Sequence, residues 1–590
     1  MDIVTTREAA TRAGRRNDAM NRRVSYTSGA SDQPLLGLTI GDAFDQTVAR
    51  FPDHEALIVC HQGRRYTYAQ LQEEVDRCAR GLMALGLHQG QRVGIWAPNR
   101  AEWTITQLAT AKIGAILVNI NPAYRLQELE YALNQSGCSM LIMAPRFRTG
   151  DYIAMLQALC PELEHAAAGE LEAVRLPQLR HVVRLSGPEC EQPVPGMWTW
   201  GDVMERADAI TPAALAERQA EQQFDDPINI QYTSGTTGNP KGATLSHHNL
   251  VNNGYFVGEL QGFTEQDRLC APVPLYHCFG CVLAHLACFT HGAAVVFPAE
   301  SFDPATTLQT VQDERCTALY GVPTMFIAEL DLPDFAHYDL STLRTGLIGG
   351  APCPIEIMGK IIERMHMREV EIIYGMTETS PISFQSRRDD PIERRVSTVG
   401  RVHPHVEVKI VDPESGRVVP TGHPGELCTR GYSVMLGYWN NEVATCQAID
   451  RARWMHTGDL ATIDGEGYVN IVGRLKDMVI RGGENIYPRE IEEFLYRHPQ
   501  ISDVQVIGVP DARYGEELMA WVRLKAGATA TIEELREYCC GQIATYKIPR
   551  YWKFVDSFPM TVTGKIQKFV MREQATIELE LEAAARRPMA

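Results

Sequence analysis

The 590-residue chain lacks any apolar run near the roughly 18 residues needed to span a bilayer. Its longest candidate, 282-VLAHLACF-289, is short and contains a histidine. An excess of positive charge is also missing, because 56 basic residues stand against 73 acidic ones and give a net charge of -17. This balance argues against a nucleic-acid partner. We therefore expect a soluble protein with no transmembrane segment.

Regular cysteine spacing and a secretion signal are absent as well. The 15 cysteines form no disulfide framework, which indicates reduced intracellular thiols. The first 23 residues contain six arginines but no apolar core. A mitochondrial transit peptide is the alternative, and Asp2, Glu8 and Asp18 weaken it. We expect a disordered tail over residues 1–30 of a cytoplasmic protein, with the mitochondrial matrix as the alternative location.

Most of the chain alternates short β-branched runs with amphipathic stretches, which is an α/β pattern. The runs 228-INIQYTS-234 and 370-VEIIYG-375 are predicted strands. Ser246 and the pair Asp303-Pro304 mark predicted helix starts. From about residue 402 the strand signals come closer together, and a β-rich subregion is expected there.

After 473-GRLKDMVIRGGENIYP-488 the pattern changes to a compact unit of roughly 110 residues, a normal size for a domain. Its predicted elements are helices near 488–498 and 532–540 and strands near 503–509 and 519–525. The sequence therefore predicts a large α/β domain followed by a small α+β domain.

The stretch 232-YTSGTTGNPKG-242 is rich in glycine and hydroxyl groups. It is not a Walker A loop, because Pro240 and Gly242 replace the second glycine and the hydroxyl residue that would hold magnesium. Glycines still allow successive backbone N–H groups to converge on an anion beside the Lys241 cation. We interpret it as a phosphate loop between a strand and a helix. A flexible surface turn is the alternative.

The phosphate loop resembles that of the adenylate-forming superfamily, which includes acyl-CoA synthetases, luciferases and peptide-synthetase adenylation domains. Besides the phosphate loop, the family's motifs follow in family order: 274-PLYHCFG-280, 374-YGMTE-378, 425-GELCTRGYSVMLGYW-439, 456-HTGD-459, 473-GRLKDMVIRGGENIYP-488 and 561-TVTGKIQK-568. From about Leu36 the resemblance covers nearly all of the chain. It implies an adenylation domain over residues 31–474, with mixed α/β sheets and a β-rich subregion, and a mobile C-terminal domain over residues 475–590.

The family's reaction joins a carboxylate to ATP, giving acyl-AMP and pyrophosphate, and a thiol then displaces AMP. By resemblance, Glu378 would bind Mg2+, Thr377 would touch the α-phosphate, and Asp459 and Arg474 would bind the ribose. The β- and γ-phosphates would be held by Thr233, Ser234, Gly235, Thr236, Thr237, Gly238 and Lys241. The adenine would lie between Tyr374 and the backbone of Gly350, Ala351 and Pro352.

The resemblance assigns three residues to domain movement. Lys565 would meet the reacting carboxylate and the α-phosphate during adenylation. Lys476 occupies the hinge position, although an ordinary basic surface loop is the alternative there. Rotation would then bring Gly483 against the pantetheine arm of coenzyme A, where a missing side chain permits close approach.

The segment 277-HCFGCVLAH-285 raises a rival interpretation. His277, Cys278, Cys281 and His285 could form a zinc quartet, but adjacent ligands do not match the usual spacing of zinc sites. Small cysteines also fit an apolar helix start. By resemblance, His277 instead lies beside the acyl pocket and the thiol entry.

Gly375 stands where acetate-selective members of the superfamily carry a tryptophan that closes the acyl pocket. A glycine leaves room for a longer acid. The residues of several motifs are most similar to those of the medium-chain fatty acyl-CoA ligase branch. We therefore expect a fatty acid:CoA ligase with fatty acid, ATP and CoA as substrates. The alternatives are an enzyme that loads a carrier-protein thiol and a catalytically silent binding protein. A homodimer and weak peripheral membrane contact stay open.

Overall fold

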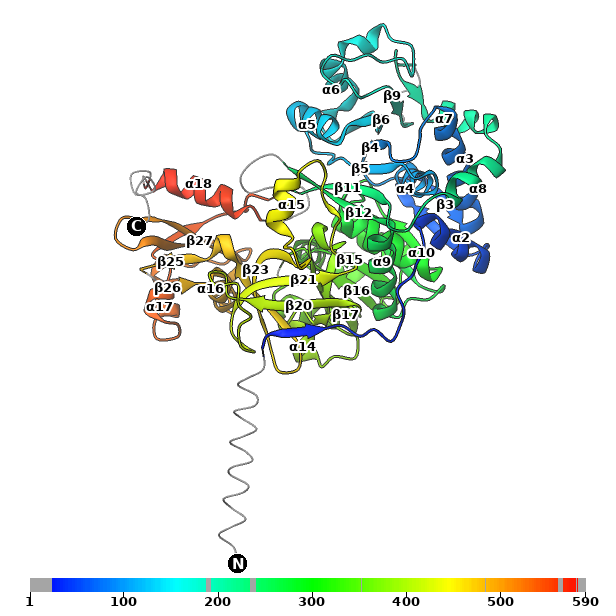
Figure 1. Ribbon diagram of the computed structural model, residues 1–590. Coiled ribbons are helices and arrows are strands. Elements are labelled where there is room, and N and C mark those ends of the chain that lie inside the picture. Colours follow the sequence, from blue (N-terminus) through cyan, green and yellow to red (C-terminus); the bar gives the residue numbers. More distant parts are fainter. Residues whose placement is uncertain are drawn as a thin grey trace, which may run out of the picture.

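The structure is a computed structural model that describes residues 24–186, 193–233, 240–351, 353–482, 484–560, 566–579 and 581 (Figure 1). Two large sheets form most of the N-terminal domain. Both are built mainly from parallel strands whose apolar side chains are buried on both faces. This arrangement confirms the predicted α/β class.

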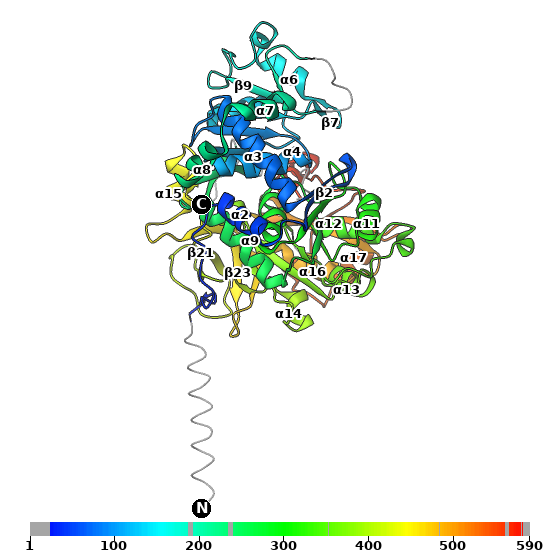
Figure 2. The same cartoon turned by 90° about the vertical axis from the view of Figure 1, so that its right-hand side faces the viewer.

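The eight-stranded sheet carries the strand that leads into the glycine loop. Its strands in spatial order are β10 (Trp198–Thr199), β9 (His181–Arg184), β6 (Cys138–Met143), β4 (Arg92–Trp96), β5 (Ile116–Asn119), β11 (Pro227–Thr233), β12 (Lys241–Ser246) and β22 (Gly437–Tyr438). In both ribbon views its outer end, near α6 (Tyr152–Leu159) and β9, lies at the top of the molecule, away from the antiparallel sheet (Figures 1 and 2).

The nine-stranded sheet carries Tyr374 and Gly375 at the end of one strand. Its strands in order are β19 (Arg401–Val402), β18 (Ile382–Gln385), β17 (Glu369–Gly375), β16 (Thr345–Ile348), β15 (Ala318–Gly321), β13 (Arg268–Cys270), β14 (Ala294–Phe297), β2 (Glu55–Val59) and β3 (Arg64–Thr67).

The helices of the large domain cover these two sheets. The predicted starts are confirmed, since Ser246 caps α9 through Asn249 and Asp303 caps α11 through Thr306. The remaining described helices of this domain are α2 (Ile40–Arg50), α3 (Tyr68–Ala84), α4 (Ala101–Ile113), α5 (Leu126–Ser136), α7 (Trp200–Glu205), α8 (Pro212–Ala220), α10 (His285–His291), α12 (Pro323–Leu330), α13 (Ile355–Arg364), α14 (Ile392–Ser397) and α15 (Glu442–Ala448); α9 is His247–Gln261 and α11 is Pro304–Asp313.

The expected β-rich subregion is confirmed as a five-stranded antiparallel sheet. Its order is β1 (Tyr26–Ser28), β20 (Val406–Val411), β21 (Gly425–Gly431), β23 (Met455–Ile463) and β24 (Val469–Arg474). Tyr26 pairs with Lys409, so β1 is an edge strand of this sheet. The predicted tail over residues 1–30 is corrected accordingly, because residues 26–28 belong to the folded domain.

The small domain has its own sheet and its own apolar core, as an independent domain should. Its strands are β25 (Val479–Arg481), β26 (Glu484–Ile486), β27 (Ile501–Asp511), β28 (Gly515–Leu524) and β29 (Tyr551–Phe554), and its helices are α16 (Pro488–Leu495), α17 (Ile532–Cys539) and α18 (Lys568–Glu578). The four elements expected near 488–540 are all present. The chain passes from one sheet to the other between Arg474 and Val479, and Lys476 lies in that passage.

The two domains touch beside the antiparallel sheet, where α16 contacts β24 (Figure 1). Across all the residues that the structure describes, no helix combines the length and the apolar character needed to cross a membrane.

Candidate active site

One end of the site is built around Asp459. Asp459 on β23 faces Arg474 at the end of β24, and Arg474 Nε lies 3.2 Å from Asp459 Oδ1. The Tyr374 hydroxyl, at the end of β17, donates a 2.5 Å hydrogen bond to Asp459 Oδ2. Three segments of the chain therefore meet at one carboxylate. The predicted contacts of these residues with adenine and ribose stay predictions.

Burial and neighbouring charges shift the pKa values of Asp459 and Tyr374 at this end. Burial raises the pKa of Asp459, while Arg474 and the Tyr374 hydrogen bond act in the opposite direction. Burial and the neighbouring carboxylate raise the pKa of Tyr374 well above its ordinary value, so its hydroxyl remains a donor at neutral pH. Asp459 is thus an acceptor with one cation and one hydroxyl already directed at it.

The other end is built around Glu378, which lies in the short helix η6 (Thr377–Thr379). Its Oε1 accepts hydrogen bonds from the Thr233 hydroxyl at 3.1 Å and the Tyr438 hydroxyl at 2.9 Å. Lys241 Nζ lies 5.0 Å from the centre of the Tyr438 ring. Glu378 is 6% exposed, so a nearly buried carboxylate accepts two hydroxyls, and the half-buried Lys241 lies beside the ring that carries one of them.

Tyr438 was missed by sequence reasoning as a site residue, although it lies within the quoted motif 425-GELCTRGYSVMLGYW-439. It reaches the site because β22 pairs with β12, where Ala243 faces Tyr438. Burial and Glu378 raise its pKa far above the usual tyrosine value, so it too acts as a donor. Only the sheet order could have revealed this neighbour.

The expected strand-loop-helix at the glycine stretch is corrected. A second strand, β12, follows the loop before α9 begins, and Thr233 on β11 is paired with Lys241 on β12. The pairing places both residues at the same end of the two strands, where the loop leaves β11 and enters β12. Ser234, Gly235, Thr236, Thr237 and Gly238 lie outside the described residues, and their predicted phosphate contacts stay predictions.

The side chain of Cys278 contacts both His277 and Thr377. Cys278 Sγ lies 3.8 Å from Thr377 Oγ1 and 3.5 Å from His277 Nδ1, which also accepts the Phe279 backbone N–H. A π-helix, Phe279–Ala284, follows directly. Such segments are frequent at functional sites. This places His277 next to the residue predicted to touch the α-phosphate.

The rival zinc quartet does not gather. His285 Nδ1 lies 2.7 Å from Gln107 Oε1 and its Nε2 lies 3.0 Å from Thr104 Oγ1, so both ring nitrogens have other partners. Burial lowers the pKa of His285 to about 3, which keeps the ring neutral. Cys281 Sγ accepts from Asn119 at 3.4 Å.

Gly375 has a structural role besides the predicted one. A Cβ at this position would lie 1.7 Å from the Pro381 carbonyl oxygen, because β17 and β18 approach closely there. Glycine is therefore required by the backbone, and its effect on acyl-chain length stays a prediction. Gly350, at φ 82°, and Ala351 follow β16, while Pro352 lies outside the described residues.

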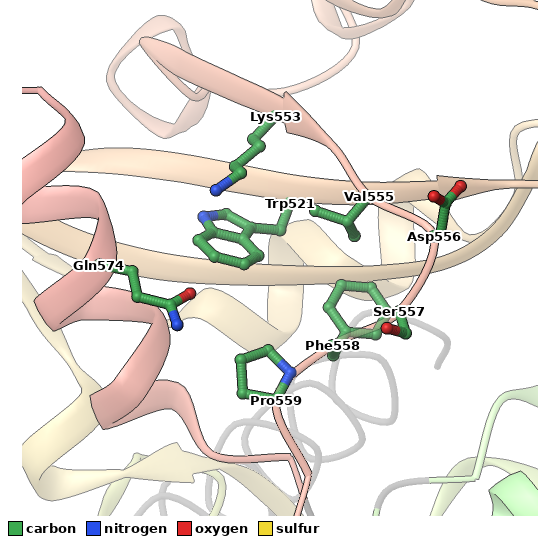
Figure 3. Close-up of a pocket in the computed structure, with 8 residues that line it drawn as sticks. All are labelled: Trp521, Lys553, Val555, Asp556, Ser557, Phe558, Pro559 and Gln574. Atoms are coloured by element: carbon green, nitrogen blue, oxygen red, sulfur yellow. The ribbon is translucent and has the colours of Figure 1, made fainter.

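Of the three residues predicted to act through domain movement, the structure describes Lys476 alone. Lys476 lies between the sheets with its charge near Arg474, Asp477 and Asp459. Gly483 and Lys565 lie outside the described residues, so their roles stay predictions. This domain has a hollow of about 540 Å³. The residues that line it are Trp521, Lys553, Val555, Asp556, Ser557, Phe558, Pro559 and Gln574 (Figure 3). None of these residues belongs to the predicted site.

Comparison with known proteins agrees with the geometry. Residues 44–439 match the family model described as AMP-binding enzyme, and residues 490–565 match AMP-binding enzyme C-terminal domain. The protein YngI of Bacillus subtilis (strain 168) is 51% identical over 92% of this chain and 98% of its own length. The mitochondrial medium-chain acyl-CoA ligase ACSF2 of Danio rerio is 47% identical over 94% of this chain and 91% of its own length.

A solved structure is similar over the whole described architecture. The anthranilate CoA ligase AuaEII, in complex with anthranoyl-AMP, has a TM-score of 0.82 and 28% identity, with 93% of this chain and 99% of that chain covered. The two-domain fold is thus shared with a protein whose structure contains an acyl-adenylate.

Proposed function

Because the chain belongs to the AMP-binding enzyme family, we propose that it is an ATP-dependent fatty acid:CoA ligase that works through an acyl-AMP intermediate. The observation that carries the proposal is the pairing of a ribose end, at Asp459, with a phosphate end, at Glu378. Medium-chain acids are the proposed substrates. The identity to ACSF2, a ligase with that specificity in its name, supports this choice.

Adenylation brings a carboxylate against a triphosphate, and the two anions repel each other. Residues of this chain can reduce that repulsion with a cation and with oriented hydroxyl donors, an effect that is usually a large part of catalysis. Thr233 donates to Glu378, and Lys241 lies beside the ring of Tyr438, whose hydroxyl donates to the same carboxylate, so both residues could act at the phosphate end. Asp459 would accept hydrogen bonds from the ribose hydroxyls and so fix the nucleotide's orientation.

Mg2+ fits the phosphate end, where Glu378 and the Thr233 hydroxyl supply the hard oxygen donors that this ion prefers. The ion would supply charge neutralisation on the phosphates when bound. CoA is the proposed second substrate, with Gly483 close to its pantetheine arm. We further propose cytoplasmic action, with the mitochondrial matrix as the alternative that the location of ACSF2 raises, and leave the homodimer to measurement.

The proposal is tested by measuring AMP and pyrophosphate release with ATP and Mg2+ over saturated acids from acetate to palmitate, each with and without CoA. Each buried CH2 adds about 0.8 kcal/mol of binding, so kcat/KM should rise with chain length until the acyl pocket is filled. We expect a maximum at intermediate length that requires CoA. Acyl-AMP that accumulates regardless of CoA would indicate carrier loading, and no turnover would indicate a silent binding protein.

Lys565→Ala separates the two half-reactions. Loss of one oriented cation should lower adenylation by at least about 10²-fold and spare thioester formation from preformed acyl-AMP. Lys547→Ala is the matched control, because Lys547 also lies in the small domain but its ammonium is 2.6 Å from the exposed Glu490. Equal losses in both half-reactions would contradict the assignment.

A further inference from the structure

A second set of chemically distinctive residues belongs to β21 and β23 of the antiparallel sheet, two strands that Figure 1 labels. Glu426 and Cys428 are two residues apart on β21, so they share one face of the strand, and His456 on β23 is the cross-strand partner of Cys428. His456 Nδ1 lies 2.9 Å from Glu426 Oε2 and 3.5 Å from Cys428 Sγ. Sheet register therefore brings a carboxylate, a thiol and an imidazole to one point.

These distances suit a small divalent cation. Among the residues placed by the structure, this is the one His/Cys/Asp/Glu group whose three ligand atoms all lie within 4.8 Å of one another. Tetrahedral zinc, with bonds of about 2.0 to 2.3 Å, separates its ligand atoms by about 3.3 to 3.6 Å. Side-chain shifts on the order of 1 Å would bring the three atoms to that geometry.

The surroundings also resemble those of a metal ligand. Asp450 Oδ2 lies 4.0 Å from His456 Nε2, which is beyond hydrogen-bond distance but on the side of the ring where an outer carboxylate commonly orients a metal-bound imidazole. Glu426 uses its other oxygen, Oε1, to accept the Gly458 backbone N–H at 3.2 Å, so Oε2 could turn to a metal without breaking that bond. The His456 side chain is 33% exposed, which provides an entry path to the buried Cys428.

We propose that Glu426, Cys428 and His456 bind Zn2+, with Asp450 positioning the imidazole and water completing the coordination. The mixed thiolate, imidazole and carboxylate donors favour zinc over magnesium or calcium, which prefer oxygen alone. The site would join β21 to β23 three residues before Asp459. It goes beyond the proposed ligase activity and does not depend on which acid is the substrate.

The test uses the full chain, freed of metal by a chelator and titrated with Zn2+ and, separately, with Co2+ in the absence of nucleotide. We expect one Zn2+ per chain and a near-ultraviolet thiolate-to-cobalt absorption band. Cys428→Ser should remove the band and weaken zinc binding by at least about 100-fold, whereas Asp450→Asn should weaken it by about 10- to 100-fold. His456→Asn provides a second ligand variant if Cys428→Ser does not fold.

Cys446→Ser is the matched control, because Cys446 is an exposed thiol outside the cluster. It should leave both the band and the zinc affinity unchanged. The proposal is overturned if the parent chain binds no stoichiometric zinc, or if zinc binds the parent, Cys428→Ser and His456→Asn equally. In either case Glu426 and His456 form only a hydrogen-bonded pair across the sheet.

Discussion

The two ends of the proposed nucleotide site differ in how their side chains are held. At the ribose end, Asp459 meets Arg474 across adjacent strands, and the Arg474 side chain is 55% exposed. At the phosphate end, Glu378 is 6% exposed and receives hydroxyls from Thr233 and Tyr438, which are 145 and 60 residues away along the chain. Register between adjacent strands thus supplies the Asp459–Arg474 contact at one end, although Tyr374 also reaches Asp459 from 85 residues away. At the other end, both partners of Glu378 come from distant segments. Polar interactions in a buried, pre-organised corner contribute more than exposed ones.

The largest loss of adenylation activity is expected at the phosphate end, where the carboxylate is the more buried of the two. Glu378→Gln keeps an oxygen that can accept from Thr233 and Tyr438 but removes the charge for a metal ion. We expect adenylation kcat/KM to fall by about 10²- to 10³-fold, measured by pyrophosphate release. Glu442→Gln, at the exposed start of α15, is the control. A smaller loss than that of Asp459→Asn would reverse the ranking of the two ends.

Asp459→Asn should act mainly on nucleotide binding. The amide can no longer accept two hydroxyls as a charged group, and such hydrogen bonds contribute about 1.5 to 3 kcal/mol. The KM for ATP should therefore rise by about 10- to 100-fold with kcat little changed. A companion measurement with 2′-deoxyATP sharpens the test, because the variant should lose the parent's preference for ATP. A preference that survives in the variant would place the ribose elsewhere.

Tyr374→Phe should have a smaller effect on the same end. It removes the 2.5 Å hydrogen bond to Asp459 but keeps the aromatic ring and leaves Arg474 in contact. We expect the KM for ATP to rise by about 3- to 10-fold, the scale of one hydrogen bond. Because the two changes act on one carboxylate, Asp459→Asn combined with Tyr374→Phe should be less than additive. Full additivity would show that the hydroxyl acts independently.

The smallest effect on activity is expected at Glu371, which lies three residues before Tyr374 on β17. Burial raises its pKa to about 8 from an ordinary value of 4.5. Between these two values the folded protein holds a proton that the unfolded chain releases, so the free energy of unfolding should decrease as pH rises and level off above about pH 8. Glu371→Gln should remove up to about 1.4 kcal/mol of this dependence per pH unit.

The measurement is Tm from pH 5 to 8.5 for the parent and the variant. The advantage of Glu371→Gln should grow with pH across that range. Glu369→Gln is the control on the same strand, since the Glu369 side chain is 40% exposed and pairs with Arg344. Parallel curves for the parent and Glu371→Gln would contradict the buried acid.

Much of this architecture follows from sequence patterns. The small-domain elements and the caps at Ser246 and Asp303 were predicted from these patterns, whereas Tyr374, Asp459 and Arg474 were chosen as site residues by resemblance alone. The strand β12 was not, because 241-KGATLS-246 is made of small and hydroxylated residues that also suit a loop. Its strand character comes from pairing with β11 and β22, which is non-local. The close approach of Gly375 to Pro381 has the same origin.

The edge strand β1 has a consequence for biosynthesis. The Tyr26 hydroxyl donates to Glu407, 381 residues further along, and the backbone of Tyr26 pairs with Lys409. At about 5 to 20 residues per second, a ribosome needs roughly 20 to 80 s to make that partner. During translation the first described strand of this protein must therefore wait, unpaired, until most of the large domain has emerged.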